Sequence, residues 1–105
     1  MKRLLTLLAA CIAACAATAQ SRIETFTFRS ALLGAEKTCS VYLPAGYDDS
    51  GRSYPVLYLL HGMSDDHTIW QRRTSIERYA ADYGIAVVMP STQLGWYTDM
   101  HIGFP

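Results

Sequence analysis

Polar side chains of chemically useful types gather in one short loop, residues 62–67, with the sequence Gly-Met-Ser-Asp-Asp-His. Asp65, Asp66 and His67 are residue types that ligate metal ions, and Ser64 is of a type that can attack a carbonyl. Adjacent acids in a polar loop more often face water or cap the next turn, so no metal site is expected. A nucleophilic serine of this kind sits in a strained G-x-S-x-G turn, and that string is absent from the 105 residues. The segment around Ser64 lacks the second glycine, so Ser64 is not expected to be a nucleophile.

A second acid and histidine, Asp99 and His101, have the residue types of a serine triad's partners. Without a serine turn, a structural or substrate-contacting role is favoured for both. Trp70, Trp96 and Tyr97 belong either to the core or to a pocket wall. Trp96 and Tyr97 follow the end of an expected parallel strand, which favours the pocket.

The loop follows an unbroken apolar run, Tyr54 to Leu60, which is typical of a strand covered on both faces of a sheet. The run stops at His61-Gly62. Ligand crevices in α/β sheets lie just beyond the carboxyl ends of such strands. We therefore interpret the His-Gly turn as the edge of a site.

Two alternating segments precede this strand, residues 23–29 and 38–43, joined by a short connection that contains Gly34. Their period of two predicts half-buried strands, and the short connection predicts an antiparallel hairpin.

A helix and a further strand follow the loop. The T-x-x-E string Thr74 to Glu77 predicts a capping box at the helix start, and Gly84 has the place of a helix-ending glycine. Ile76, Tyr79, Ala80 and Tyr83 are spaced to form one apolar face. The apolar segment 85–89 then predicts a second buried strand, which completes a right-handed βαβ unit with parallel strands.

These segments resemble a known family. The string at 54–63 (Tyr-Pro-Val-Leu-Tyr-Leu-Leu-His-Gly-Met), Trp70, Val87-Val88-Met89-Pro90 and the Gly-Trp-Tyr-Thr-Asp string at 95–99 are similar to the N-terminal part of the "putative esterase" family of α/β-hydrolases. That family includes tributyrin, feruloyl and acetylxylan esterases, S-formylglutathione hydrolases and mycolyltransferases. The expected fold class is therefore α/β: the N-terminal part of an α/β-hydrolase fold, incomplete, with an antiparallel strand pair followed by a parallel βαβ unit.

The resemblance implies a serine carboxylesterase that needs no cofactor and no metal. It assigns an oxyanion-hole donor to the backbone N–H of Met63, with His61, Gly62, Trp96, Tyr97 and Asp99 as pocket-lining residues. The serine turn and its acid and histidine partners are expected beyond Pro105. The segment alone is then expected to be inactive, and its aromatic-rich end suggests a chain cut within a domain. Two alternatives remain: an acyltransferase of the same fold, and a non-catalytic member that binds a carbohydrate or a partner.

The N-terminus, residues 1–19, has the layout of a signal peptide: Lys2-Arg3, an apolar run, and Ala-Thr-Ala before Gln20. The apolar run is too short for a membrane span. The expected product is an exported protein, periplasmic or secreted, with the hydrolase segment in residues 20–105. The alternative is a lipoprotein, anchored at Cys15 or, after a shorter apolar run, at Cys11.

Composition is ordinary for a globular protein, with 50% hydrophobic and 17% charged residues. Loss of Lys2 and Arg3 from nine basic and nine acidic residues leaves seven against nine, so nucleic acid is not an expected partner. Cys39 would be the only cysteine after cleavage, which excludes an internal disulfide in this segment. The expected partner is a small-molecule or carbohydrate-linked ester substrate, and the oligomeric state is not predicted.

Overall fold

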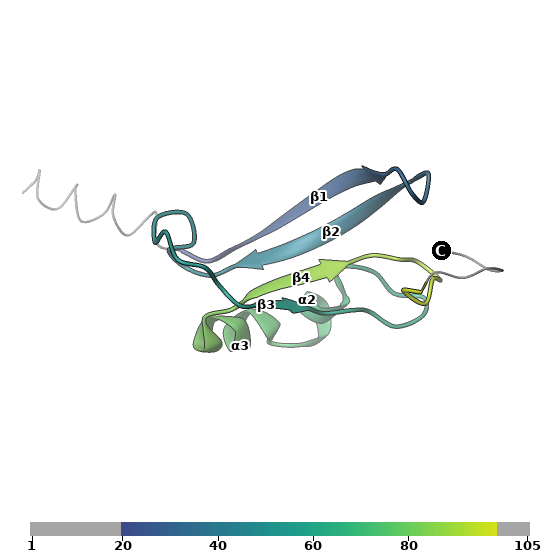
Figure 1. The fold of residues 1–105 in the computed structure, drawn as a ribbon. Helices are drawn as coiled ribbons and strands as arrows, with labels where there is room; N and C mark the ends of the chain where they lie inside the picture. The colour runs from purple at the N-terminus through teal and green to yellow at the C-terminus, as the bar shows by residue number, and fades with distance from the viewer. Residues whose placement is uncertain (1–19, 99–105) are drawn as a thin grey trace, which may run out of the picture.

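A computed structural model describes residues 20–98 of the chain (Figure 1). The predicted signal segment 1–19, and with it Cys11 and Cys15, lies outside the described residues, as do Asp99 and His101. The described elements are β1 (Arg22–Ser30), β2 (Ala35–Leu43), β3 (Val56–Tyr58), α2 (Ile69–Arg73), α3 (Ile76–Tyr83) and β4 (Ala86–Pro90). Neither described helix has the length and apolar character needed to cross a bilayer.

The four strands form one mixed sheet in the order β1-β2-β4-β3. β1 and β2 pair antiparallel, and β3 and β4 pair parallel with α2 and α3 between them in the chain. The predicted hairpin and the predicted βαβ unit are both confirmed. The two are joined by antiparallel pairing of β2 with β4.

The hairpin is set by matching side chains across its register. Thr25 pairs with Ser40 and Thr27 with Thr38, and their hydroxyl oxygens lie 2.8 and 3.0 Å apart. Such cross-strand hydroxyl pairs stabilise antiparallel ladders. The turn ends at Gly34, whose φ of 63° is a conformation that glycine adopts without strain.

The helical segment differs from the sequence prediction at its start. Thr74 does not begin the helix but is the C-cap of α2, because its N–H donates to the Trp70 carbonyl oxygen at 3.0 Å. The next helix, α3, begins at Ile76 with Ser75 as its N-cap. The Thr74 hydroxyl accepts from the Ile76 N–H at 3.2 Å, but no hydrogen bond from Glu77 completes a capping box within the described residues. The predicted glycine at the helix end is confirmed, since Gly84 has φ 61° and donates to the carbonyl oxygens of Ala80 and Ala81.

The core lies between the sheet and the helices. Tyr42, Val87 and Met89 point from β2 and β4 toward α3 and surround Ala80, all at most 1% exposed. Ile76 packs against this cluster, whereas Tyr79 and Tyr83 of the predicted apolar face are 50% and 79% exposed.

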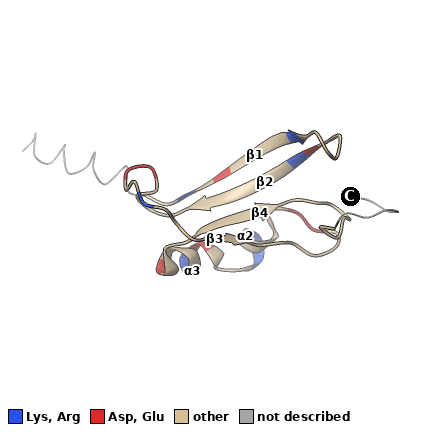
Figure 2. Cartoon of the chain, in the orientation of Figure 1, with Lys and Arg blue, Asp and Glu red and all other residues tan. Residues whose placement is uncertain are grey.

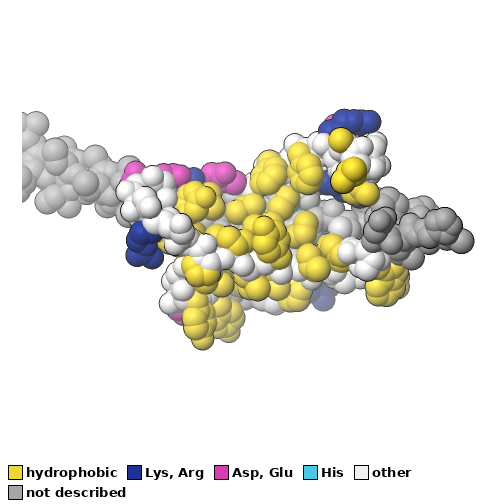
Figure 3. All heavy atoms as spheres, in the orientation of Figure 1, with side chains coloured by type: hydrophobic (Ala, Val, Ile, Leu, Met, Phe, Trp, Pro, Cys, Tyr) yellow, Lys and Arg dark blue, Asp and Glu magenta, His cyan; other side chains and the backbone are white. Residues whose placement is uncertain are grey.

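The other face of the sheet is apolar and open in the described residues. Val41, Tyr58 and Val88 share one register row on this face, and β3 and β4 carry no charged residue (Figure 2). Hydrophobic side chains gather across the middle of the molecule in Figure 3.

β3 therefore differs from the prediction of a strand covered on both sides. Its regular part is only Val56–Tyr58, although hydrogen bonds to β4 continue from the Pro55 carbonyl oxygen to the Leu59 N–H. Val56, Leu57 and Tyr58 are 50%, 40% and 68% exposed. The reason is positional: β3 is the edge of the described sheet, and its outer face has no covering layer among residues 20–98.

Candidate functional site at the His-Gly turn

The His61-Gly62 turn follows β3 at its carboxyl end, beside the loop that follows the parallel strand β4. His61 is 6% exposed, and its ring Nε2 accepts a hydrogen bond from the Thr92 N–H at 3.0 Å. The side chain of His61 therefore joins the two loops that leave neighbouring parallel strands. This is the edge where α/β sheets place their ligand crevice.

The contacts of His61 fix its protonation pattern. A backbone N–H can only donate, so Nε2 must be the unprotonated nitrogen and Nδ1 carries the proton. Nδ1 lies 2.7 Å from the carbonyl oxygen of Gly62, to which it donates. His61 is thus a neutral imidazole with both nitrogens satisfied, which suits a structural role in the turn.

The Gly62 carbonyl oxygen also accepts from the Asp65 N–H at 3.3 Å. Two donors therefore hold this one oxygen. Peptide units are planar and trans, so a carbonyl and the N–H that follows it point in opposite directions. Fixing the Gly62 oxygen therefore fixes the direction of the Met63 N–H, the donor that the family resemblance assigns to the oxyanion hole.

The Met63 N–H has no hydrogen-bond partner in the described part of the chain. The Met63 side chain is 69% exposed. A preoriented backbone N–H at a strand end can stabilise negative charge that develops on a carbonyl oxygen during attack.

Glycine is not required at position 62 by backbone conformation. Gly62 has no positive φ, and a Cβ built on it meets no described atom within 4 Å. Ser64 instead has the left-handed conformation of this turn, with φ 65°. Among residues 20–98, the space beside Gly62 is therefore open to a ligand.

The acidic residues of the loop are engaged in the loop itself. Asp65 Oδ1 accepts from Arg72 Nη2 at 2.8 Å and from the Asp66 N–H at 3.0 Å. Asp66 Oδ1 accepts from the Thr68 N–H at 2.8 Å and from the Thr68 hydroxyl at 2.5 Å, and these bonds lower the pKa of Asp66. Among residues 20–98, no three His, Cys, Asp or Glu side chains are grouped as metal ligands.

The aromatic residues named from the sequence have different environments. Trp70 packs against the core and donates its ring N–H to the Leu60 carbonyl oxygen at 3.2 Å, so it supports the strand end that leads into the turn. Trp96 is 67% exposed. The Tyr97 hydroxyl hydrogen-bonds the backbone of His61, and the two rings pack in a T-shaped arrangement with their centroids 5.6 Å apart.

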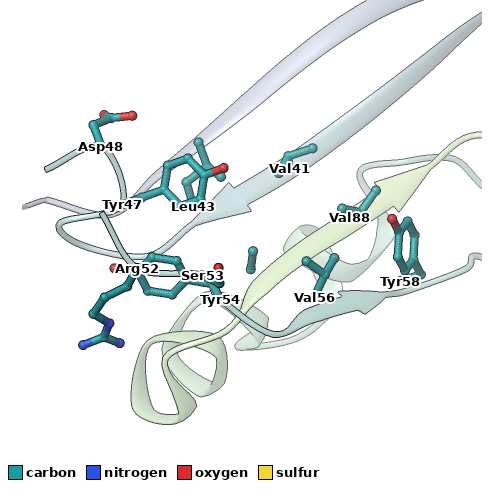
Figure 4. A pocket seen from close by; sticks show the side chains of 11 residues that line it. Val41, Leu43, Tyr47, Asp48, Arg52, Ser53, Tyr54, Val56, Tyr58 and Val88 are labelled. Atoms are coloured by element: carbon teal, nitrogen blue, oxygen red, sulfur yellow. The ribbon is translucent and has the colours of Figure 1, made fainter. Parts of the chain in front are cut away.

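A separate cavity of about 580 Å³ lies on the open face of the sheet (Figure 4). Its apolar wall comes from three strands: Val41 and Leu43 of β2, Val56 and Tyr58 of β3, and Val88 of β4. His61, Gly62 and Met63 do not line it. We interpret this cavity as part of the uncovered sheet face, distinct from the turn.

Sequence reasoning found the turn but missed what holds it. The roles of Thr92 and of the Tyr97 hydroxyl depend on contacts 31 and 36 residues away in the chain, and no local pattern indicates them.

The comparisons with known proteins agree with this fold. The model of the "Putative esterase" family matches residues 30–94. An esterase of Mycobacterium tuberculosis is 36% identical over 83 residues, which is 74% of this chain and 18% of that protein. An S-formylglutathione hydrolase of Paracoccus denitrificans is 33% identical over 67 residues, 64% of this chain and 23% of that protein.

The chain is also similar to solved structures of esterases and serine hydrolases. The fluorophosphonate-binding serine hydrolase F of Staphylococcus aureus is similar with a TM-score of 0.68 and 32% identity, over 80% of this chain and 35% of that one. A ferulic acid esterase is similar with a TM-score of 0.62 and 29% identity, over 71% of this chain and 32% of that one. The chain thus spans about a fifth of the length of the two curated relatives and about a third of the two solved ones. The expected α/β-hydrolase fold is confirmed for this part, and the chain belongs to the "Putative esterase" family.

Proposed function

We propose that the chain is the N-terminal segment of a serine carboxylesterase and supplies one half of its oxyanion hole. The observation that carries the proposal is the Gly62-Met63 peptide, held by two hydrogen bonds to the Gly62 oxygen, whose Met63 N–H has no partner among residues 20–98. Family membership supports the ester chemistry. From the family resemblance we also propose a pocket lined by His61, Gly62, Trp96, Tyr97 and Asp99, of which Asp99 lies outside the described residues.

In the proposed reaction, a serine oxygen attacks the ester carbonyl carbon while a histidine takes the serine proton. The carbonyl oxygen becomes an oxyanion that the Met63 N–H stabilises. The alcohol leaves with that proton, and water then releases the acyl group from the serine. No cofactor takes part in these steps.

We place the serine, its histidine and its acid beyond Pro105. No G-x-S-x-G string occurs in the 105 residues, and the chain matches only a fraction of the length of its relatives. The open apolar face of the sheet also supports a covering layer from further residues, because such a surface is costly to leave in water.

The experiment measures ester hydrolysis by the full-length protein. The substrates are p-nitrophenyl acetate and butyrate, a feruloyl ester and S-formylglutathione, each with and without an added alcohol. Hydrolysis supports the proposal, and acyl transfer to the alcohol would favour the acyltransferase alternative. Turnover of none of these substrates, together with no labelling by a fluorophosphonate, would overturn the proposal in favour of a non-catalytic binding member.

We also propose that residues 1–19 direct export and are removed before Gln20. The mass of the mature N-terminus tests this proposal. A chain that begins at Gln20 supports soluble export to the periplasm or beyond, and a diacylated Cys15 would show a lipoprotein instead.

A further inference from the structure

The backbone of His61 leaves the sheet without the pairing that strands provide. The last hydrogen bond between the β3 segment and β4 is from the Leu59 N–H to the Val88 carbonyl oxygen, at 2.9 Å. His61 lies two residues further on and is nevertheless buried. Buried backbone groups need partners, so the N–H and C=O of His61 must find them outside the sheet.

One side chain supplies both partners. The Tyr97 hydroxyl oxygen accepts from the His61 N–H at 3.0 Å, and the same hydroxyl donates to the His61 carbonyl oxygen at 3.3 Å. A phenol can make both bonds because it is a donor and an acceptor at once. The Tyr97 ring also meets the His61 ring edge-on, with an angle of 68° between the rings.

Tyr97 holds this position in a strained backbone conformation. Its φ is 58°, a left-handed value that a bulky side chain rarely adopts. Strained residues persist where surrounding contacts hold them, and they cluster at functional sites. Here the holding contacts are those with His61.

The contacts continue from His61 to the donor. The His61 ring donates to the Gly62 carbonyl oxygen, and the plane of that peptide sets the direction of the Met63 N–H. The chain of contacts is therefore Tyr97 hydroxyl, His61 backbone, His61 ring, Gly62 oxygen and Met63 N–H.

We propose that Tyr97 is a positioning residue of the oxyanion hole, whose hydroxyl holds His61 so that the Met63 N–H keeps one direction. This inference rests on the proposed esterase function and adds to it. Because the Tyr97 hydroxyl bonds the backbone of His61, that hydroxyl is not available to bind a substrate.

The test compares Tyr97→Phe with Tyr83→Phe in the full-length protein. Phenylalanine keeps the ring at position 97 and removes only the hydroxyl, while Tyr83 is 79% exposed on α3 and serves as the control. For p-nitrophenyl butyrate, Tyr97→Phe should lower kcat about tenfold, a part of the loss seen when a whole donor is removed. KM should stay within about twofold, because the lost interaction acts on the transition state. The control should match the wild type.

Amide hydrogen exchange gives a readout that does not depend on turnover. In the wild type, the His61 amide should be protected to a degree similar to that of Leu59, and Tyr97→Phe should speed His61 exchange by about tenfold or more. A His61 amide that exchanges in the wild type as fast as a free loop amide would overturn the proposal without any variant. A rise in KM with unchanged kcat would also overturn it, since that result marks a substrate contact. If the wild type hydrolyses no ester, the proposed function fails, and exchange alone decides whether Tyr97 holds the turn.

Discussion

The ring of His61 accepts a hydrogen bond from the backbone N–H of Thr92 at 3.0 Å, which ties the turn after β3 to the loop after β4. The two loops leave neighbouring parallel strands, so the bond connects them at the carboxyl ends of β3 and β4. The other ring nitrogen holds the Gly62 oxygen. One neutral histidine thus determines both the position of the turn and the direction of the next N–H.

His61→Leu tests this arrangement. Leucine has a comparable apolar bulk but leaves the Thr92 N–H without its partner, which should lower the free energy of unfolding by about 1–3 kcal/mol. The loss of the Gly62 contact should also lower kcat. Urea unfolding and ester hydrolysis by the full-length protein measure the two effects, and unchanged values for both would contradict the role of the ring.

Gly62→Ala and Gly84→Ala form a matched pair of glycine substitutions. Gly84 has φ 61°, so alanine there should destabilise the protein by about 1–2 kcal/mol and leave activity unchanged. At Gly62 the added methyl meets no described atom, so stability should change by less than about 0.5 kcal/mol.

Of this pair, only Gly62→Ala should lose activity. The new methyl of Gly62→Ala would lie where the ester approaches the Met63 N–H, and kcat/KM should fall about tenfold or more. If Gly62→Ala retains full activity, the ester does not approach beside Gly62.

Ser64→Gly separates conformation from chemistry in the loop. Ser64 has φ 65°, which glycine adopts more readily. The free energy of unfolding of the variant should therefore be no more than about 0.5 kcal/mol below that of the wild type. Ester hydrolysis should stay within about twofold if Ser64 is not the nucleophile. Loss of fluorophosphonate labelling in this variant would make Ser64 the nucleophile after all.

Asp66 should contribute to the acid sensitivity of the fold. The Thr68 hydroxyl, followed by the Thr68 N–H, lowers the pKa of Asp66 in the folded protein. The ionised form is therefore favoured by folding, and its stabilising contribution is present above the ordinary carboxyl pKa and is lost as pH falls through the folded pKa.

Thr68→Val removes the larger cause of this shift. The difference in urea midpoint between pH 7 and pH 3 should therefore be smaller in Thr68→Val than in the wild type. Asp66→Asn, which keeps an acceptor oxygen but does not titrate, should reduce the difference further. An unchanged difference in both variants would show that the Asp66 bonds do not contribute to acid unfolding.

Residues 20–105 expressed alone should aggregate or stay partly unfolded. The β3 edge has no outer neighbour in the described residues, and the apolar face around Val88 has no cover there. Unpaired edges and open apolar faces promote association. Size-exclusion chromatography and urea unfolding test this, and a monomer with one cooperative transition would contradict the proposal that further residues complete the sheet.

The amino-acid sequence alone determined the local elements of this protein. The alternating pattern predicted the first two strands, and the apolar runs around Val56 and Val87 predicted the other two. Gly84 marked the end of the helix. These features follow from periods of two and 3.6 residues, which each stretch of chain carries by itself. The family resemblance then assigned the proposed oxyanion donor to Met63.

Only the tertiary structure decided what holds that donor. His61 meets Thr92, and Tyr97 meets His61, because parallel pairing of β3 with β4 brings their carboxyl ends side by side. The same arrangement left β3 at an edge, where its apolar run is exposed in the described residues. Hydrogen-bond partners and burial depend on distances in space, and a local pattern carries no information about residues more than 30 positions away.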